Sequence, residues 1–263
     1  MSAVVETVRS HWPEYLMEAA GLGLFMVSAA VATTLLEYPV SPLHEAFPDP
    51  TIRRVLIGVA MGMTAIALIY SPWGARSGAH LNPAVTLTFL RLGKIQGVDA
   101  LGYVVGQFIG GTVGLLMTAA VIGMAVRHPS VNYVVTVPGQ AGSAVAFLAE
   151  IIISFGMMLI VLVTSNHHRL RVWTGLFAGA LVASFIAIEA PLSGMSMNPA
   201  RSFASAFPAD IWSAFWIYLT APLAGMLLAA ECYVRARGAH GVLCAKLHHH
   251  TGCRCIFRCG YAA

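Results

Sequence analysis

The sequence predicts an all-α membrane protein with six transmembrane helices and two re-entrant half-helices, arranged as two inverted repeats. Three observations lead to this prediction. Of the 263 residues, 58% are hydrophobic and 10% are charged, whereas a soluble domain carries about a quarter charged residues. Six apolar segments approach the length of about 20 residues that spans a bilayer. Finally, "SGAHLNPAVT" at 77–86 and "SGMSMNPARS" at 193–202 share one pattern.

The charge and cysteine content exclude several other classes of protein. The net charge of +4 comes from basic residues scattered around apolar runs, so we expect no nucleic-acid partner. The apolar stretch at 19–36 follows two glutamates and has no basic region before it, so we expect no cleavable signal peptide. Four of the five cysteines lie between 244 and 259, which does not resemble a disulfide framework. We also expect no cofactor.

The predicted spans divide the chain into an N-terminal segment, one membrane domain and a tail. We place the spans at 14–36, 52–72, 98–125, 141–165, 172–190 and 211–235. They must be helices, because lipid offers the backbone no hydrogen-bonding partner. Gly-rich stretches such as "GQFIGGTVG" at 106–114 suit close helix packing in lipid. The membrane domain covers 14–235, with repeats at about 14–125 and 141–235, between a segment at 1–13 and a basic tail at 236–263.

The two "SG…NPA" stretches lie between spans two and three and between spans five and six. Each precedes an apolar run that is too short to cross the membrane, so we expect a half-length helix that enters and leaves on one side. Three spans per repeat force the two halves to insert with opposite topology, as in many transport proteins. The half-helices then meet end to end near the midplane, where non-helical backbone is tolerated if it lines a cavity.

The Asn-Pro pairs suit the beginnings of these half-helices. Asn caps the first backbone N–H groups, and Pro fits the first helical position. The amide groups of Asn82 and Asn198 are then free to point into the cavity. Two helix N-termini that face one point produce a positive potential, which repels cations but not neutral molecules. The alternative is that each Asn-Pro-Ala is only a helix-starting turn, but two copies with one prefix in matching places favour the site.

The distribution of Lys and Arg predicts the orientation in the membrane. If both termini are cytoplasmic, the inner segments hold Arg9, Arg76, Arg91, Lys94, Arg169, Arg171, Arg235, Arg237, Lys246, Arg254 and Arg258. The outer segments then hold only Arg53, Arg54, Arg127 and Arg201. The positive-inside rule favours this orientation.

The two motif stretches make the chain resemble the aquaporin, or major intrinsic protein, family over roughly residues 14–235. The resemblance implies a passive channel, not an enzyme, for water, small neutral solutes such as glycerol, urea or ammonia, or both, with protons and ions excluded. It also implies a homotetramer embedded in lipid. The compact loops suit a bacterial inner membrane. The family's pore motifs correspond to Asn82, Pro83, Ala84, Asn198, Pro199 and Ala200.

The resemblance also implies a narrow selectivity filter. By position its members are Arg201, Met195, Ile186 and either Met61 or Gly62. Strict water channels carry a His and a bulky aromatic residue in this ring. The ring here is less polar, so we expect a wider filter that admits solutes larger than water. Glycerol channels usually have Asp directly after the filter arginine, whereas this chain has Ser202.

Three further residues are candidates for supporting the motif loops. Glu18 and Glu150 occupy matching places near the start of spans one and four. In relatives, similar glutamates bind backbone groups of these loops, although a membrane carboxylate is also a candidate for proton coupling. His80 is placed to hydrogen-bond the same loops, with pore gating as the alternative. If the glutamates were coupled to protons, the chain would be a secondary transporter built on the same repeat.

The tail "CAKLHHHTGCRCIFRCGY" at 244–261 contains metal-ligating residue types at irregular spacing. Cysteine and histidine are soft ligands, and the stretch includes the histidines at 248–250. We expect a disordered, membrane-adjacent tail that holds no metal. The alternative is a metal site at Cys253, Cys255 and Cys259, and with it a membrane metalloenzyme.

Overall fold

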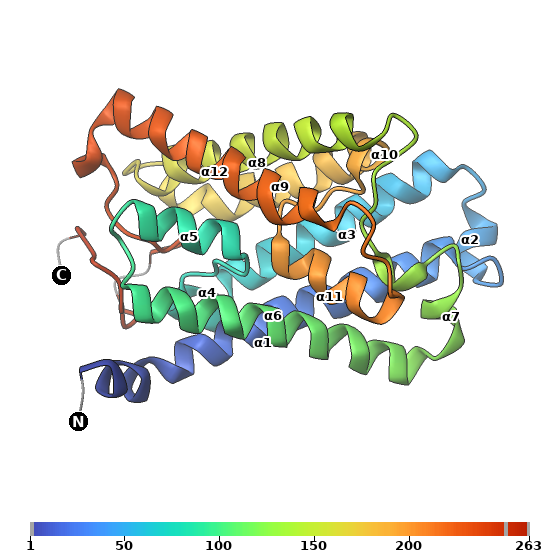
Figure 1. Ribbon diagram of the computed structural model, residues 1–263, viewed down its shortest axis with the longest axis horizontal. Coiled ribbons are helices and arrows are strands. Elements are labelled where there is room, and N and C mark those ends of the chain that lie inside the picture. The colour runs from blue at the N-terminus through green and yellow to red at the C-terminus, as the bar shows by residue number, and fades with distance from the viewer. Residues whose placement is uncertain (1–2, 250–251, 262–263) are drawn as a thin grey trace.

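The computed structural model describes residues 3–249 and 252–261, so His250 lies outside the described residues. Six helices are long and apolar enough to cross a membrane (Figure 1). They are α1 (Ala3–Glu37), α3 (Pro50–Tyr70), α6 (Gly97–Ile122), α8 (Ser143–Ser165), α9 (Thr174–Ile188) and α12 (Phe215–Arg237). Helix α1 begins and α12 ends at the same end of the bundle. We call this end the terminal face and the other end the opposite face.

Shorter helices connect the long ones. The two half-helices are α5 (Pro83–Arg91) and α11 (Pro199–Ala209). Each lies between the second and third long helix of its half, as predicted from the motifs. The other short helices are α2 (Pro42–Ala46), α4 (Pro72–Ser77), α7 (Met124–Arg127), α10 (Ala190–Ser193), η1 (Asn132–Val134), η2 (Arg171–Trp173) and η3 (Ala239–Gly241).

Helix α1 starts well before the span predicted at 14–36. It runs without a break from Ala3 and includes Pro13. Its first turns pack against the bundle through two polar contacts. Glu14 accepts from Arg76 Nε at 2.9 Å, and His11 Nδ1 lies 2.7 Å from an Asp99 carboxylate oxygen. Residues 3–13 are therefore part of this helix and not a separate segment. The other five predicted spans agree with the helices to within a few residues.

Helix packing joins the two halves of the bundle. Within each half α1 packs along α6 and α8 along α12, while α3 of the first half packs against α9 of the second. The half-helices also cross over, since α5 contacts α12 and α11 contacts α6. Small residues permit the close approaches: a Cβ atom on Gly110 of α6 would lie 2.0 Å from the Ala19 carbonyl oxygen of α1. This agrees with packing through small residues in lipid.

The tail after α12 is ordered and folds back across the terminal face. Ala245, Lys246 and Leu247 are buried. The Lys246 ammonium donates to the carbonyl oxygens of Ala75 and Arg254, both at 2.7 Å. The expectation of a disordered tail is therefore wrong for its described residues. Buried apolar contacts and backbone acceptors at the terminal face, which the local sequence pattern does not reveal, hold it in place.

Candidate functional site: a pore formed by two matching loops

The two motif loops have the same unusual backbone. Each begins with a left-handed glycine, Gly78 at φ 96° and Gly194 at φ 82°. Two further residues of each loop also have positive φ: Ala79, Leu81, Met195 and Met197. Such angles are rare outside glycine and need support from their surroundings. The matching angles make the loops structural counterparts.

A buried glutamate supports each loop. Glu18 of α1 accepts hydrogen bonds from Ser77 Oγ at 2.7 Å and from the N–H groups of His80 and Leu81 at 3.1 and 2.6 Å. Glu150 of α8 accepts from Ser193 Oγ and from the N–H groups of Ser196 and Met197, each at 2.7 Å. These bonds satisfy backbone donors that have no helical partner, as buried polar groups require.

Two tyrosines that the sequence analysis missed complete the support. Tyr103 of α6 donates to the Ser77 carbonyl oxygen at 2.6 Å. Tyr218 of α12 donates to the Ser193 carbonyl oxygen at the same distance. Both side chains are fully buried. They lie in the third long helix of each half, α6 and α12.

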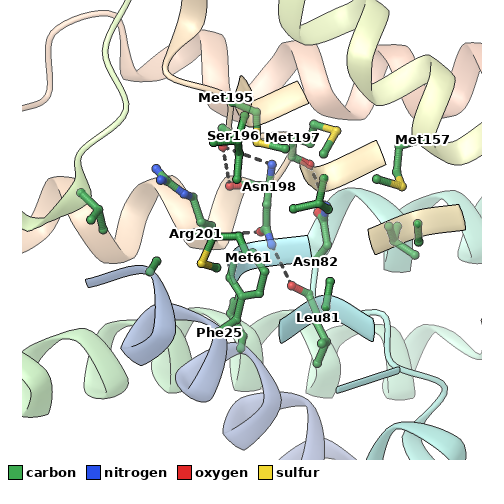
Figure 2. Close-up of a pocket in the computed structure, with 18 of the residues that line it drawn as sticks. Phe25, Met61, Leu81, Asn82, Met157, Met195, Ser196, Met197, Asn198 and Arg201 are labelled. Atoms are coloured by element: carbon green, nitrogen blue, oxygen red, sulfur yellow. Dashed lines mark hydrogen bonds between the residues drawn. The ribbon is translucent and has the colours of Figure 1, made fainter. Parts of the chain in front are cut away.

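The two motif asparagines join the loops at the centre of the bundle. Asn82 Oδ1 accepts from Ala84 N, and Asn198 Oδ1 accepts from Ala200 N and Arg201 N, so both are N-caps. Their amide groups reach across to the other loop. Asn82 Nδ2 donates to Met197 O and Asn198 Nδ2 donates to Leu81 O, both at 2.7 Å (Figure 2). Each amide group has a second N–H, which takes no part in these two bonds.

A cavity of about 340 Å³ passes the asparagine pair. Asn82, Asn198 and Arg201 line it together with three of the predicted filter residues, Met61, Ile186 and Met195. Gly62, the other candidate on α3, does not. A Cβ atom on Gly62 would lie 2.5 Å from the Gly179 carbonyl oxygen, so this face of α3 packs directly on α9. Of the two candidates on α3, Met61 is the one that lines the cavity.

Two arginines supply donors to the cavity. Arg201 lines it, and no hydrogen-bond partner of its Nη1 atom is found among the described residues. Arg54, which the sequence placed simply in an outer loop, also lines the cavity while its Nε donates to the Ala187 carbonyl oxygen at 3.0 Å. Arg54 lies in the first turns of α3, which begins at Pro50 near the opposite face, so its guanidinium lies on that side of the asparagine pair.

His80 connects its loop to the tail as well as to α5. Its Nδ1 atom lies 3.0 Å from Thr86 Oγ1, and its Nε2 atom donates to the Ala245 carbonyl oxygen at 2.8 Å. The ring stacks between Phe89 and Phe257, with centroids 5.1 and 5.4 Å away. The sequence suggested hydrogen bonds from His80 to the motif loops, whereas its ring bonds Thr86 at the start of α5 and Ala245 of the tail.

One tail residue reaches the cavity itself. The Leu247 side chain lines the cavity, and the residue is 6% exposed. Its N–H donates to the Gly78 carbonyl oxygen at 3.1 Å. The tail thus occupies the end of the cavity at the terminal face. Nothing in the sequence pattern pointed to this position.

The tail also gathers four side chains of metal-ligating types. The ligand atoms of Cys244, His249, Cys255 and Cys259 all lie within 4.8 Å of one another. Cys253, the remaining member of the alternative set named from the sequence, is not among them. The folding of the tail brings these four residues together, and their spacing in the sequence does not reveal it.

Comparison with known proteins agrees with this architecture. The profile described as "Major intrinsic protein" matches residues 5–233. The chain belongs to the major intrinsic protein family. Members of this family are passive membrane channels, so the chain is a channel protein and not an enzyme.

Individual relatives of the family cover much of the chain. It is 35% identical to glycerol uptake facilitator protein-like 6 of Lactiplantibacillus plantarum, over 67% of this chain and 82% of that protein. It is 33% identical to aquaporin NIP2-2 of Zea mays, over 82% of this chain and 72% of that protein. The solved aquaglyceroporin of Plasmodium falciparum shares the fold, with a TM-score of 0.66 and 21% identity, covering 84% of this chain and 94% of its own.

Proposed function

We propose that the cavity is a pore for water and for small neutral solutes such as glycerol, urea or ammonia. One observation carries the proposal: Asn82, Asn198 and Arg201 present hydrogen-bond donors to a cavity whose walls are mainly apolar. Two similar proteins, a glycerol uptake facilitator and an aquaglyceroporin, have names that agree with this class of solute.

Each donor has a distinct role in the proposed mechanism. The remaining amide N–H groups of Asn82 and Asn198 donate to a passing oxygen, while the asparagine Oδ1 atoms are occupied in capping. The N-termini of α5 and α11 add a positive potential of roughly half a charge each. Protons and cations are therefore repelled at the centre, and Arg201 repels them again at the filter.

The filter composition favours solutes larger than water. Met61, Ile186 and Met195 give the ring with Arg201 flexible apolar walls. Ser202, which stands where glycerol channels usually carry Asp, does not line the cavity. Its hydroxyl lies 2.7 Å from Thr136 Oγ1 and 2.6 Å from Ser196 Oγ, so it belongs to the wall behind the pore.

The geometry gives no support to proton coupling through the two glutamates. Coupling needs an ionisable group that faces the pathway. Glu18 and Glu150 do not line the cavity. All four of their carboxylate oxygens accept hydrogen bonds from the motif loops. The two glutamates act as structural supports in our proposal, and His80 joins α5 to the tail.

The proposal includes a location and an assembly. The protein is an integral multi-pass membrane protein, and the excess of Lys and Arg near the terminal face favours cytoplasmic termini. We place it in a bacterial inner membrane as a homotetramer with one pore per subunit. The channel domain covers 14–235, and α1 extends it toward the N-terminus.

Stopped-flow light scattering on proteoliposomes tests the function. We expect fast osmotic shrinkage and, in a separate assay, uptake of glycerol or urea above that of protein-free vesicles. Fast water flow without any solute uptake would show that the apolar ring is narrow, which contradicts the proposed solute class. Vesicles with no excess of either permeability, for the wild type and for Leu247→Ala alike, would contradict the pore itself.

A further inference from the structure

The four-residue cluster in the tail has the composition and compactness of a structural metal site. It contains three cysteines and one histidine from two short segments, 244–249 and 255–259. Cys244 Sγ lies 3.6 Å from Cys255 Sγ, and Cys259 Sγ lies 3.1 Å from His249 Nε2. Cys244 is buried, and His249 and Cys255 are half-buried.

These distances fit a tetrahedral ion better than a disulfide bond. Zn–S bonds of about 2.3 Å at tetrahedral angles place two sulfur atoms about 3.8 Å apart. A disulfide requires about 2.05 Å, and all the cysteines are free. Three cysteines with one histidine make a common structural zinc set. Thiolates also favour zinc over hard ions such as magnesium or calcium.

The surroundings of the cluster suit its charge. Three thiolates and one histidine around Zn²⁺ leave a net charge of about −1. Lys246 is buried two residues after Cys244, and its ammonium donates to the carbonyl oxygen of Arg254, the residue before Cys255. The Arg171 guanidinium also lies 5.1 Å from the centre of the Tyr261 ring, which itself contacts His249. Lys246, which lies between two ligands in sequence, and Arg171, which comes from η2, therefore balance the charge of the site.

The cluster is connected to the pore by Leu247. This residue lies between two ligands in sequence, Cys244 and His249, and its side chain lines the cavity at the terminal face. The backbone on either side of it is held by the Ala245 carbonyl bond to His80 and by the Leu247 N–H bond to Gly78. An ion bound by the cluster would fix both ends of this short segment.

We propose that Cys244, His249, Cys255 and Cys259 bind one Zn²⁺ ion, and that the bound ion keeps Leu247 seated in the mouth of the pore at the terminal face. The zinc site is independent of what the pore conducts. The gating step rests on the proposed function. The tail thus serves as a zinc-dependent closure, and loss of zinc releases it.

Metal analysis of the full-length protein tests the site without any transport assay. Protein purified in detergent, equilibrated with micromolar Zn²⁺ and then desalted should retain about one zinc per chain. Co²⁺ in place of zinc should show the visible bands of tetrahedral coordination and a thiolate charge-transfer band. Cys255→Ser and Cys259→Ser should each lose the retained metal and these bands. Cys253→Ser, in the same tail but outside the cluster, and Cys232→Ser on α12 should keep both.

Three results would overturn the zinc site. They are wild-type protein that retains no stoichiometric zinc, equal loss of metal in Cys253→Ser and Cys255→Ser, and a Cys244–Cys255 disulfide found by mass spectrometry in place of metal. A melting temperature measured for each variant separates loss of a ligand from loss of the fold.

Water permeability of proteoliposomes tests the closure. Coupling between two sites usually changes an equilibrium by 5- to 150-fold, so we expect removal of zinc by a membrane-permeant chelator to raise permeability by about tenfold. Cys253→Ser should respond to the chelator in the same way. Cys255→Ser and Leu247→Ala should be open from the start and insensitive to it.

Bound zinc whose removal leaves the permeability unchanged would overturn the closure. Failure of the proposed function has a different signature. In that case no preparation conducts, including Leu247→Ala and chelated protein, while the zinc analysis is unaffected.

Discussion

Asn82 and Asn198 each cap one half-helix and, through the same side chain, donate a hydrogen bond to the loop that precedes the other half-helix. Each side chain therefore fixes the start of its own helix and its distance from the opposite loop. The pore centre depends on the pair as a unit, since removal of one asparagine frees groups on both loops.

Replacement of Asn198 by alanine should damage both stability and conduction. Ala200 N and Arg201 N lose their cap, and the Leu81 carbonyl oxygen loses its donor. Loss of a cap alone costs about 1 kcal/mol, up to about 2. We expect a lower melting temperature in detergent and reduced water permeability. Asn82→Ala should behave alike, and normal values for either variant would contradict the paired role.

Replacement of Glu18 by glutamine and replacement of Glu150 by glutamine should each destabilise the protein, and by about the same amount. A glutamine presents an NH₂ group where each carboxylate now accepts from loop donors. One N–H then faces another, and an unsatisfied buried donor costs about 1–3 kcal/mol. The measurement is thermal unfolding in detergent. Glu45→Gln, on the exposed part of α2, is the control and should leave the melting temperature unchanged.

Glu18→Gln and Glu150→Gln also separate the structural role from proton coupling. A structural role predicts lower stability and no change in how flux depends on an imposed pH gradient. Solute uptake that a pH gradient drives in the wild type, but not in these variants, would instead favour a transporter.

Alanine at the adjacent positions 61 and 62 should affect different properties: solute uptake at 61 and stability of the fold at 62. Met61 lines the cavity, so Met61→Ala enlarges the filter and should raise uptake of the larger solutes. Gly62 faces the Gly179 carbonyl oxygen, where a Cβ atom would lie at 2.5 Å. Gly62→Ala must therefore separate α3 from α9 and should lower the melting temperature and the yield of folded protein. The reverse pattern would show that Gly62 faces the filter.

Replacement of Arg201 by valine should relax selectivity. The change removes a positive charge and the Nη1 donor that has no partner among the described residues. We expect faster uptake of urea or glycerol relative to water and a measurable proton leak in vesicles loaded with a pH indicator. Wild-type solute ratios and an intact proton barrier would exclude Arg201 from the filter.

The positions of the membrane helices and half-helices were predictable because each has a strong local signal. An apolar run long enough to cross lipid must be helical, and Asn82-Pro83 marks a helix start by side-chain chemistry alone. The same kind of reasoning paired Glu18 with Glu150, because membrane carboxylates in matching repeats are conspicuous.

Features that depend on contacts between distant segments were not predictable in this way. Tyr103 and Tyr218 look like ordinary aromatic residues of apolar helices, and only the fold brings each hydroxyl to a loop carbonyl. The basic residues that interleave with the cysteines and histidines of the tail favoured disorder. Its order comes from acceptors at the terminal face, such as the Ala75 carbonyl oxygen that binds Lys246.

The exchange of half-helices between the two halves has a consequence for how the chain is made. A growing chain can insert α1, α3 and α6 and bring Glu18 to its own loop while the second half is still in the ribosome. Yet α5 then lacks α12, against which it packs, and Asn82 lacks the Met197 carbonyl oxygen. The pore wall is therefore incomplete until the last helix emerges, since α12 packs against α5 and adds Met226 to the cavity lining. Synthesis of α12 thus completes the packing of a half-helix that the chain made more than a hundred residues earlier.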